Sequence, residues 1–555
     1  MEFIMTGEIS SVGGSPQAQS AKPYITGIII KPQSMFSGHS YRLRIPGLDA
    51  TLSIRLSKDG TPVTNTLTDL GKKFVKLEII SPQNTNLTEV FVKVSNLAKH
   101  LKLTEEEINK AVKEGKLPQL IDAQKQINRA ISLIANEISM RTGDERHGAL
   151  EAEKLRTEIE VAHRSLAQSD THTIASANSK HKYVFIRSDK AQSSGVVAMK
   201  MFTPTDSVIG YGSYNTVFEV NLRSLTSSQG DLDAAHVVAE PSGMEGKPLE
   251  EVKKRQEESK AQMESAIKIL KKLHVDEQGN KKIIEGIQHP PFAVVTIDGK
   301  KGYLMPYYGK GDLRVHAKDL NEASGFANTQ RLLGGFSHIL SQNSFYNDIK
   351  PDNILVNNQR ECDLADFGGV VTFDEMLQDA TYHEKTDTIS SNHLPDTSPG
   401  WLMMKDKVKR EVLFIQCVKA KDQYEKALTL KGPDDPEVKQ LLKRYEEKKE
   451  EHETYAKKNM IFSMGLSLSF MAVPELQENF ARETDDESLI KLVKDISKAI
   501  NRLCDELQRQ PNPQNEERLK YYALIYNMIR QESASRISPE DLNKTLAGLQ
   551  NVPSM

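Results

Sequence analysis

The stretch NDIKPDNILV at residues 347–356 decides the fold class of this chain. It places a carboxylate at Asp348, a lysine two residues later and an amide at Asn353, and it ends in an apolar run typical of a strand. Ten residues after this run, the chain continues with Asp366-Phe367-Gly368. Each of these residues alone would be an ordinary turn residue, but their joint spacing is hard to obtain by chance.

These residue types suit the transfer of a phosphoryl group to a hydroxyl. Such a reaction needs a carboxylate that orients the hydroxyl and accepts its proton, oxygen ligands for Mg²⁺, and a cation near the moving charge. We therefore predict a catalytic pair and a pair of metal ligands. The catalytic residues are Asp348 and Lys350, and the metal ligands are Asn353 and Asp366.

The two motifs resemble those of the eukaryotic-type protein kinase family. A lysine two places after the catalytic Asp348 is similar to the serine/threonine branch of that family. The resemblance implies an α+β fold with two lobes, in which a small antiparallel β lobe precedes a large helical lobe and ATP binds between them. It also implies ATP and Mg²⁺ as cofactors and a protein as substrate.

Sequence upstream of these motifs resembles the family's nucleotide site. The run IGYGSYNTV at 209–217 is similar to the glycine-rich loop, whose glycines let backbone amides approach the phosphates. The run LMPYYGKGDL at 304–313 resembles the last strand of the small lobe, the hinge and the start of the next helix. The resemblance implies a gatekeeper at Met305 and a ribose ligand at Asp312. The full set of implied nucleotide contacts is Ile209, Gly210, Gly212, Val217, Met305, Tyr307 and Asp312.

Further matches at 397–402, 462–465 and 536–542 extend the resemblance from about residue 183 to residue 546. The chain departs from the family ahead of the catalytic aspartate, where Tyr346-Asn347 replaces His-Arg. The missing arginine implies activity that is not gated by phosphorylation of the activation segment.

A second departure lies at Met403-Met404-Lys405, where the family has Ala-Pro-Glu. The family's glutamate pairs with the late arginine, here Arg536, and a lysine cannot make that pair. Either Asp406 substitutes for the glutamate or the contact is lost.

The lysine that holds the α- and β-phosphates in the family is not identified in this sequence. Glu240 stands at its expected place. The form V-A-x-K occurs at 197–200, but this strand precedes the glycine-rich loop, and we expect Lys200 to be a strand lysine at the far edge of the sheet. Lys247 or a lysine on the following long helix could supply the charge, and Glu264 is the first candidate for the matching helix glutamate.

The length of the chain predicts several domains, because 555 residues exceed the size of one compact domain. A capping box at Thr104 marks the start of helix after a strand-rich region. The insertion at 405–458, rich in Lys and Glu and broken at Gly432-Pro433, predicts a helical hairpin that is either decorative or a docking arm for a partner. The predicted segments are a flexible leader (1–22), a β-rich domain (23–100), a helical connector and linker (101–182), a small lobe with hinge (183–313) and a large lobe carrying the insertion (314–555).

The net charge, the cysteine spacing and the length of the apolar runs restrict the classes of partner and compartment that we expect. Lys plus Arg number 73 and Asp plus Glu number 76, a net charge of −3, so nothing favours a nucleic-acid partner. Three cysteines without CxxC spacing argue against a disulfide scaffold and favour a reducing compartment. The longest apolar run, at 461–473, is too short to span a bilayer. We therefore expect a cytoplasmic protein without a membrane partner.

Three functions stay open at this stage. The intact catalytic and metal-ligand residues favour a serine/threonine-protein kinase, whereas Glu240, Lys405 and the long insertion favour a pseudokinase that serves as a binding module. An altered phosphate clamp is also compatible with another transfer chemistry, such as AMP transfer. The atypical motifs and the β-rich domain resemble eukaryotic-like effector kinases of intracellular bacterial pathogens, which implies secretion into a host cytosol and action on host proteins.

Overall fold

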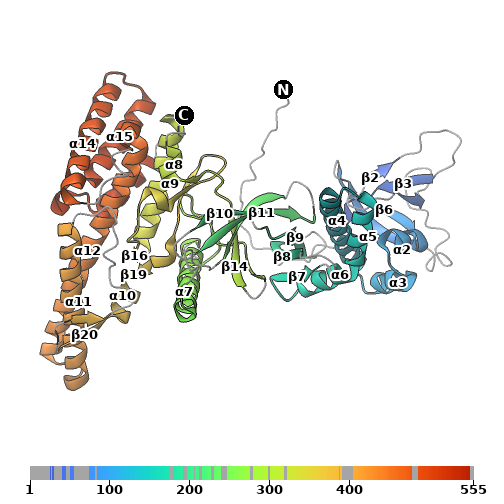
Figure 1. Cartoon of the computed structure of the whole chain (residues 1–555), viewed down its shortest axis with the longest axis horizontal. Helices are drawn as coiled ribbons and strands as arrows, with labels where there is room; N and C mark the ends of the chain where they lie inside the picture. The colour runs from blue at the N-terminus through green and yellow to red at the C-terminus, as the bar shows by residue number, and fades with distance from the viewer. Residues whose placement is uncertain are drawn as a thin grey trace. The chain divides into compact units, whose positions relative to one another are not determined.

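The chain forms two compact units in this computed structural model (Figure 1). The first comprises Met1–Asp206, Val220–Ala234 and Ala293–Ile297, and the second comprises Ser207–Glu219, Ala235–Phe292 and Asp298–Met555. The structure describes residues 25–26, 28–30, 40–44, 51–55, 74–81, 84–175, 181–191, 197–205, 207–211, 215–226, 231–238, 247–275, 279–297, 300–317, 320, 322–384, 386, 388–390, 404–477 and 485–550.

A six-stranded sheet opens the first unit, with strand order β1-β5-β6-β4-β3-β2. β5 and β6 pair antiparallel along most of their length, from Phe74 opposite Lys93 to Ser81 opposite Asn84. Every strand of this sheet lies within the segment expected to be rich in strands. The strands are β1 (Ile25–Thr26), β2 (Ile28–Ile30), β3 (Ser40–Arg44), β4 (Thr51–Arg55), β5 (Phe74–Ser81) and β6 (Asn84–Lys93).

Five helices follow in the first unit. The predicted capping box is present at the start of α3, where the Thr104 hydroxyl accepts from the backbone N–H of Glu107 at 3.2 Å and the Glu107 carboxylate accepts from that of Thr104 at 2.7 Å. These bonds fix the start of the helix, because two of its otherwise unpaired N–H groups gain acceptors. The helices are α2 (Val94–Leu101), α3 (Glu105–Lys113), α4 (Leu117–Thr142), α5 (Glu145–Lys154) and α6 (Arg156–Ser165).

The helices share an apolar core with the strands that follow them. Ile159 of α6 and Phe185 of β8 are both fully buried in it. β7 falls inside the segment 101–182, expected to be a helical connector and linker, and its residues pair antiparallel with β8. This part of the prediction is wrong, because β8 supplies a pairing partner and Ile174 is buried in the shared core. The strands are β7 (Thr171–Ala175), β8 (Lys182–Ala191) and β9 (Val197–Phe202).

Strands and one long helix form the first part of the second unit. β10 pairs antiparallel with β11, β11 neighbours β12, and β12 neighbours β14. The residues of β11 and β12 belong partly to each unit. The bounds are β10 (Val208–Tyr211), β11 (Thr216–Ser224), β12 (Leu232–Val238), α7 (Leu249–Leu273) and β14 (Lys300–Pro306). β13 (Ala293–Ile297) lies between α7 and β14 in the sequence but belongs to the first unit.

The rest of the second unit is mainly helical. The predicted hairpin at 405–458 is present as two antiparallel helices, α11 and α12, which turn at Gly432 with a φ of +81°. The elements are β15 (Gly311–Asp312), α8 (Leu313–His316), α9 (Glu322–Ser341), β16 (Ser344–Phe345), η3 (Pro351–Asn353), β17 (Ile354–Val356), β18 (Cys362–Leu364), η4 (Phe367–Gly369), β19 (Val371–Thr372), α10 (Phe373–Asp379), β20 (Thr381–His383), β21 (Thr388–Ser390), α11 (Met404–Lys431), α12 (Pro436–Ala472), η5 (Pro474–Leu476), α14 (Asp486–Gln508), α15 (Pro513–Met528), η6 (Ser533–Ser535) and α16 (Pro539–Gln550).

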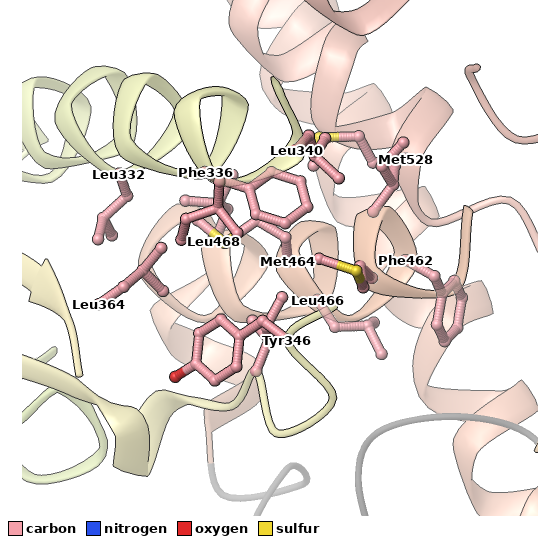
Figure 2. Close-up of a cluster of buried hydrophobic side chains, with 14 of the residues drawn as sticks. Leu332, Phe336, Leu340, Tyr346, Leu364, Phe462, Met464, Leu466, Leu468 and Met528 are labelled. Atoms are coloured by element: carbon pink, nitrogen blue, oxygen red, sulfur yellow. The ribbon is translucent and has the colours of Figure 1, made fainter. Parts of the chain in front are cut away.

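The apolar run at 461–473 forms the end of α12 and lies in the centre of the large core. Figure 2 shows Phe336 of α9, Met464 and Leu468 of α12 and Met528 of α15 together in this core, with the ring of Tyr346 at its border. Tyr346 therefore attaches the candidate catalytic stretch at 347–356 to this core. No helix among the described residues is long and apolar enough to cross a membrane.

Candidate active site

A small hairpin brings the two predicted motifs together. β17 pairs antiparallel with β18, with Ile354 opposite Leu364, and the N–H of Ala365 donates to the carbonyl of Asn353 at 2.8 Å. Asp366 follows this hydrogen bond directly in the sequence. The spacing of ten residues between the motifs is thus the length that this hairpin needs.

Asp348 is held on two sides. The ammonium of Lys350 donates to both of its carboxylate oxygens, at 2.9 and 2.7 Å. The amide nitrogen of Asn353 donates to the backbone carbonyl of Asp348 at 2.8 Å and to its Oδ2 at 2.9 Å. These hydrogen bonds fix the orientation of the Asp348 carboxylate. Because they use the amide nitrogen of Asn353, its amide oxygen is the group that is left for another partner.

Asp366 adopts the left-handed backbone conformation, with φ of 57°. Its side chain reaches solvent but is crowded by protein atoms, and this partial desolvation raises the pKa of its carboxyl. The negative charge of Asp348 raises the pKa further, while Lys350 and the N–H of Gly368 lower it. The structure thus brings all four predicted catalytic and metal-binding residues into one electrostatic group.

Tyr346 stands at the position where the protein kinase motif has histidine, and its side chain links the two motifs. Its hydroxyl donates to the buried carbonyl of Ala365, and its ring stacks on Phe367 with centroids 5.2 Å apart. Burial raises its pKa well above the usual value, so the phenol stays a neutral donor. The substitution therefore keeps a polar link between the stretch at 347–356 and the residue before Asp366.

A buried arginine approaches the catalytic stretch from α11. Nη1 of Arg410 donates to the side-chain oxygen of Asn347 at 2.6 Å, and its guanidinium lies over the ring of Phe345 at 5.4 Å. Arg410 is only 3% exposed. Sequence reasoning missed this residue, because nothing in the local pattern of a charged helix distinguishes one arginine from another.

The implied nucleotide contacts of the glycine-rich loop are only partly visible. Gly210 lies opposite Val217 in the β10–β11 pair, and a Cβ added at Gly210 would meet nothing within 4 Å. Ile209 is exposed and Val217 is half-buried. Gly212 lies outside the described residues. The described part of the loop consists of the two paired strands, with space for a side chain at Gly210.

The implied gatekeeper and hinge residues lie at the end of β14 and directly after it. Met305 packs against a small apolar cluster formed by Met263 and Ile267 of α7 and by Tyr303. Tyr307 is half-buried, and the hydroxyl of its neighbour Tyr308 donates to buried Asp363 at 2.9 Å. Asp312 caps α8 by accepting from the N–H of Val315 at 3.0 Å, a structural role that the sequence reading did not assign.

The candidates for the phosphate clamp are placed as follows. Lys200 lies in β9, in the first unit, and β9 pairs with both β8 and β11, so the expectation of an edge strand is wrong. Lys247 pairs with Glu251 at 3.2 Å on the exposed start of α7. Glu264 pairs with Lys301 at 2.7 Å on an exposed surface, which engages it away from the site. Glu240 lies outside the described residues.

α7 meets the second motif through a different residue. The backbone oxygen and Cβ of Gln262 lie 3.6 Å from the position that a Cβ on Gly368 would take. One turn earlier, Ser259 is fully buried and its hydroxyl has no hydrogen-bond partner. α7 therefore approaches the segment after Asp366 through Gln262, whereas Glu264 pairs with Lys301.

Two comparisons with curated proteins bear on this site. Over 107 residues the chain is 27% identical to CBL-interacting serine/threonine-protein kinase 18 of Arabidopsis thaliana, which covers 18% of this chain and 21% of that protein. Over 133 residues it is 26% identical to putative CBL-interacting protein kinase 13 of Oryza sativa subsp. japonica, which covers 22% of this chain and 26% of that protein. The similarity thus spans about a quarter or less of each relative. No family model matches the chain.

Proposed function

We propose that this protein is an ATP- and Mg²⁺-dependent kinase that transfers the γ-phosphoryl group to serine or threonine hydroxyls of a protein substrate. The observation that carries the proposal is the fixed carboxylate of Asp348, which accepts from both Lys350 and Asn353 next to Asp366. The partial similarity to plant serine/threonine kinases supports the same class of reaction.

In this proposal Asp348 orients the substrate hydroxyl and takes its proton. The two donors leave the carboxylate little freedom to rotate, and a fixed base reduces the entropy cost of reaching the transition state. Lys350 is 2.7 Å from Oδ2 of Asp348, so its positive charge lies beside the path of the transferred group. The two side chains act as a unit.

Asn353 and Asp366 would hold Mg²⁺. Their donor chemistry fits, since the amide of Asn353 turns its nitrogen toward Asp348 and keeps its oxygen, and Mg²⁺ prefers oxygen ligands. Desolvation raises the pKa of Asp366 and the nearby charge of Asp348 raises it further, and a cation would relieve the repulsion between the two carboxylates. Mg²⁺, when bound, neutralises charge on the phosphates.

The order of elements in the second unit supports a nucleotide site of the kinase type. The β10–β11 turn, α7, β14 and the segment 306–312 precede the catalytic stretch in that order. The neighbouring order β10-β11-β12-β14 is compatible with the small lobe that the resemblance implies. The two-lobed fold is part of this proposal.

Transfer of label from γ-labelled ATP to a library of serine and threonine peptides tests the proposal. We expect activity in the wild type, a loss of about a hundredfold or more in Asp348→Asn, and little change in Asp352→Asn. Asp352 is the matched control because it lies four residues away and pairs with Arg314 at 3.0 Å on the surface. Equal rates for the two variants would contradict a role for Asp348.

The same assay separates the alternatives. Label that is incorporated from α-labelled rather than γ-labelled ATP would replace the proposal with nucleotidyl transfer. Mg²⁺-dependent ATP binding without any transfer would favour a pseudokinase.

A further inference from the structure

The segment that follows Asp366 lies against the helical hairpin α11–α12. Figure 1 shows α10 and β20 beside this hairpin. Tyr382 of β20 and Ile389 of β21 pack against the large core, and the side chain of Lys419 on α11 lies over the ring of Tyr382 at 5.2 Å. The insertion is therefore in contact with the chain that leads out of the candidate site.

Apolar contacts anchor the beginning of this segment. Phe373, the first residue of α10, is fully buried and meets the ring of His452 on α12 edge-on, with centroids 5.9 Å apart. The same His452 ring lies 5.2 Å from that of Phe414 on α11. Phe373 also lies 5.6 Å from Phe345, which leads into the catalytic stretch. One aromatic cluster thus links the hairpin with both motifs.

Polar contacts continue along α10. The ammonium of Lys421 on α11 donates to the backbone carbonyl of Leu377 at 2.8 Å, and Lys421 is largely shielded from solvent. Lys449 on α12 pairs with Asp374 at 2.6 Å. Each exposed ion pair contributes little by itself, but contacts from both helices converge on a single short helix.

The hairpin also reaches the catalytic stretch itself. Arg410 of α11 donates to Asn347, the residue immediately before Asp348, at 2.6 Å. Its Nε has no hydrogen-bond partner. Asn347 is therefore an acceptor for this buried cation.

We propose that the α11–α12 hairpin is a built-in positioning element, which fixes Asn347 and the segment 371–384 so that the site is ordered without a covalent modification. This inference rests on the proposed function, because its catalytic readout is phosphoryl transfer. Lys449, Lys421 and Arg410 are positioning residues, since they act on the site through Asp374, Leu377 and Asn347 and do not touch a reacting group.

A charge reversal at Lys449 tests the inference in the full-length protein. Lys449→Glu places like charges at the contact with Asp374, and we expect kcat to fall roughly three- to tenfold with KM for ATP unchanged. The double variant Lys449→Glu/Asp374→Lys should regain most of the rate. Lys443→Glu is the matched control, because Lys443 is exposed on the same helix and pairs with Glu447 of that helix at 4.0 Å.

Hydrogen exchange of peptides from 371–384 provides a second readout that does not require activity. We expect faster exchange there in Lys449→Glu than in Lys443→Glu, and recovery in the double variant. Equal exchange and equal kcat in the two single variants would overturn the inference. A wild type that transfers no phosphoryl group would overturn the proposed function instead, and the exchange result would still decide whether the hairpin orders the segment.

Discussion

Arg536 and Asp406 form a buried ion pair although 130 residues separate them in the sequence. The two residues are 3% and 2% exposed. The hydroxyl of Tyr455 donates to the other carboxylate oxygen of Asp406 at 2.7 Å, and Nη1 of Arg536 donates to Asn459 at 2.9 Å. The pair joins the start of α11 to the chain before α16. The sequence left two alternatives, in which Asp406 replaces the family's glutamate or the contact with Arg536 is lost. The structure shows the first, with Asp406 as the partner of Arg536.

Replacing Asp406 by alanine should destabilise the protein by about 3–5 kcal/mol, because it leaves the charge of Arg536 buried without a counterion. The free energy of unfolding from urea titration measures this effect. Lys405→Ala is the control, since the neighbouring Lys405 pairs with Glu532 at 2.8 Å on the surface. Loss of this surface ion pair should lower the free energy of unfolding by about 0–1 kcal/mol. Similar costs for the two variants would show that the buried pair is not important for stability.

Replacing Asp366 by asparagine should raise the stability of the metal-free protein at neutral pH. Desolvation and the charge of Asp348 raise the pKa of Asp366, so the folded state disfavours the ionised form. For a carboxyl with a raised pKa, the favourable contribution is present below the unfolded-state pKa and is lost as the pH rises through the folded-state pKa. Asparagine does not ionise, so the Asp366→Asn variant does not lose this stability as the pH rises. Thermal unfolding at neutral pH without Mg²⁺ measures the gain.

The same substitution should abolish any stabilisation by Mg²⁺ and ATP. Asp352→Asn serves as the control and should retain the ligand-dependent rise in Tm. A rise that survives in Asp366→Asn would remove Asp366 from the metal site. In the wild type, the affinity for Mg²⁺–ATP should decline as the pH falls through the raised pKa, because the proton competes with the metal.

Local spacing predicted the parts of the fold that depend on neighbouring residues. Strand β17 follows from the apolar run that ends the stretch 347–356, the start of α3 from the capping box at Thr104, and the turn of α11–α12 from Gly432. In each case the hydrogen bonds or backbone angles involve residues close in sequence. Such features can be read without knowledge of the tertiary structure.

Contacts between distant residues could not be predicted in the same way. Arg410 meets Asn347 across 63 residues, and Glu264 pairs with Lys301 instead of entering the site. β7 forms within an expected linker because β8 supplies its partner. These outcomes depend on which surfaces the core brings together, and a charged side chain carries no local signal of its partner.

Tyr346→Phe should lower stability by about 1–3 kcal/mol, because it leaves the buried carbonyl of Ala365 without its donor while the stacking on Phe367 stays. Urea titration measures the change, and kcat should fall with it, since the same bond ties the catalytic stretch to Asp366. Tyr424→Phe removes a hydroxyl from the half-buried ring stack with Tyr445 in the hairpin and should change stability by less than about 0.5 kcal/mol. Equal effects would contradict this role of Tyr346.

His452 should make stability depend on pH. Its ring is buried and its Nδ1 has no hydrogen-bond partner, and burial, with a smaller effect of the charge on Arg410, lowers its pKa to about 4. A histidine with a lowered pKa contributes stability that is present above its unfolded-state pKa of about 6.5. This stability, about 3 kcal/mol in all for His452, is lost as the pH falls toward the folded-state pKa. His452→Phe should flatten the stability profile between pH 6.5 and 4, whereas His147→Gln, at an exposed site, should leave the slope unchanged. A slope that His452→Phe does not reduce would assign the acid sensitivity to other groups.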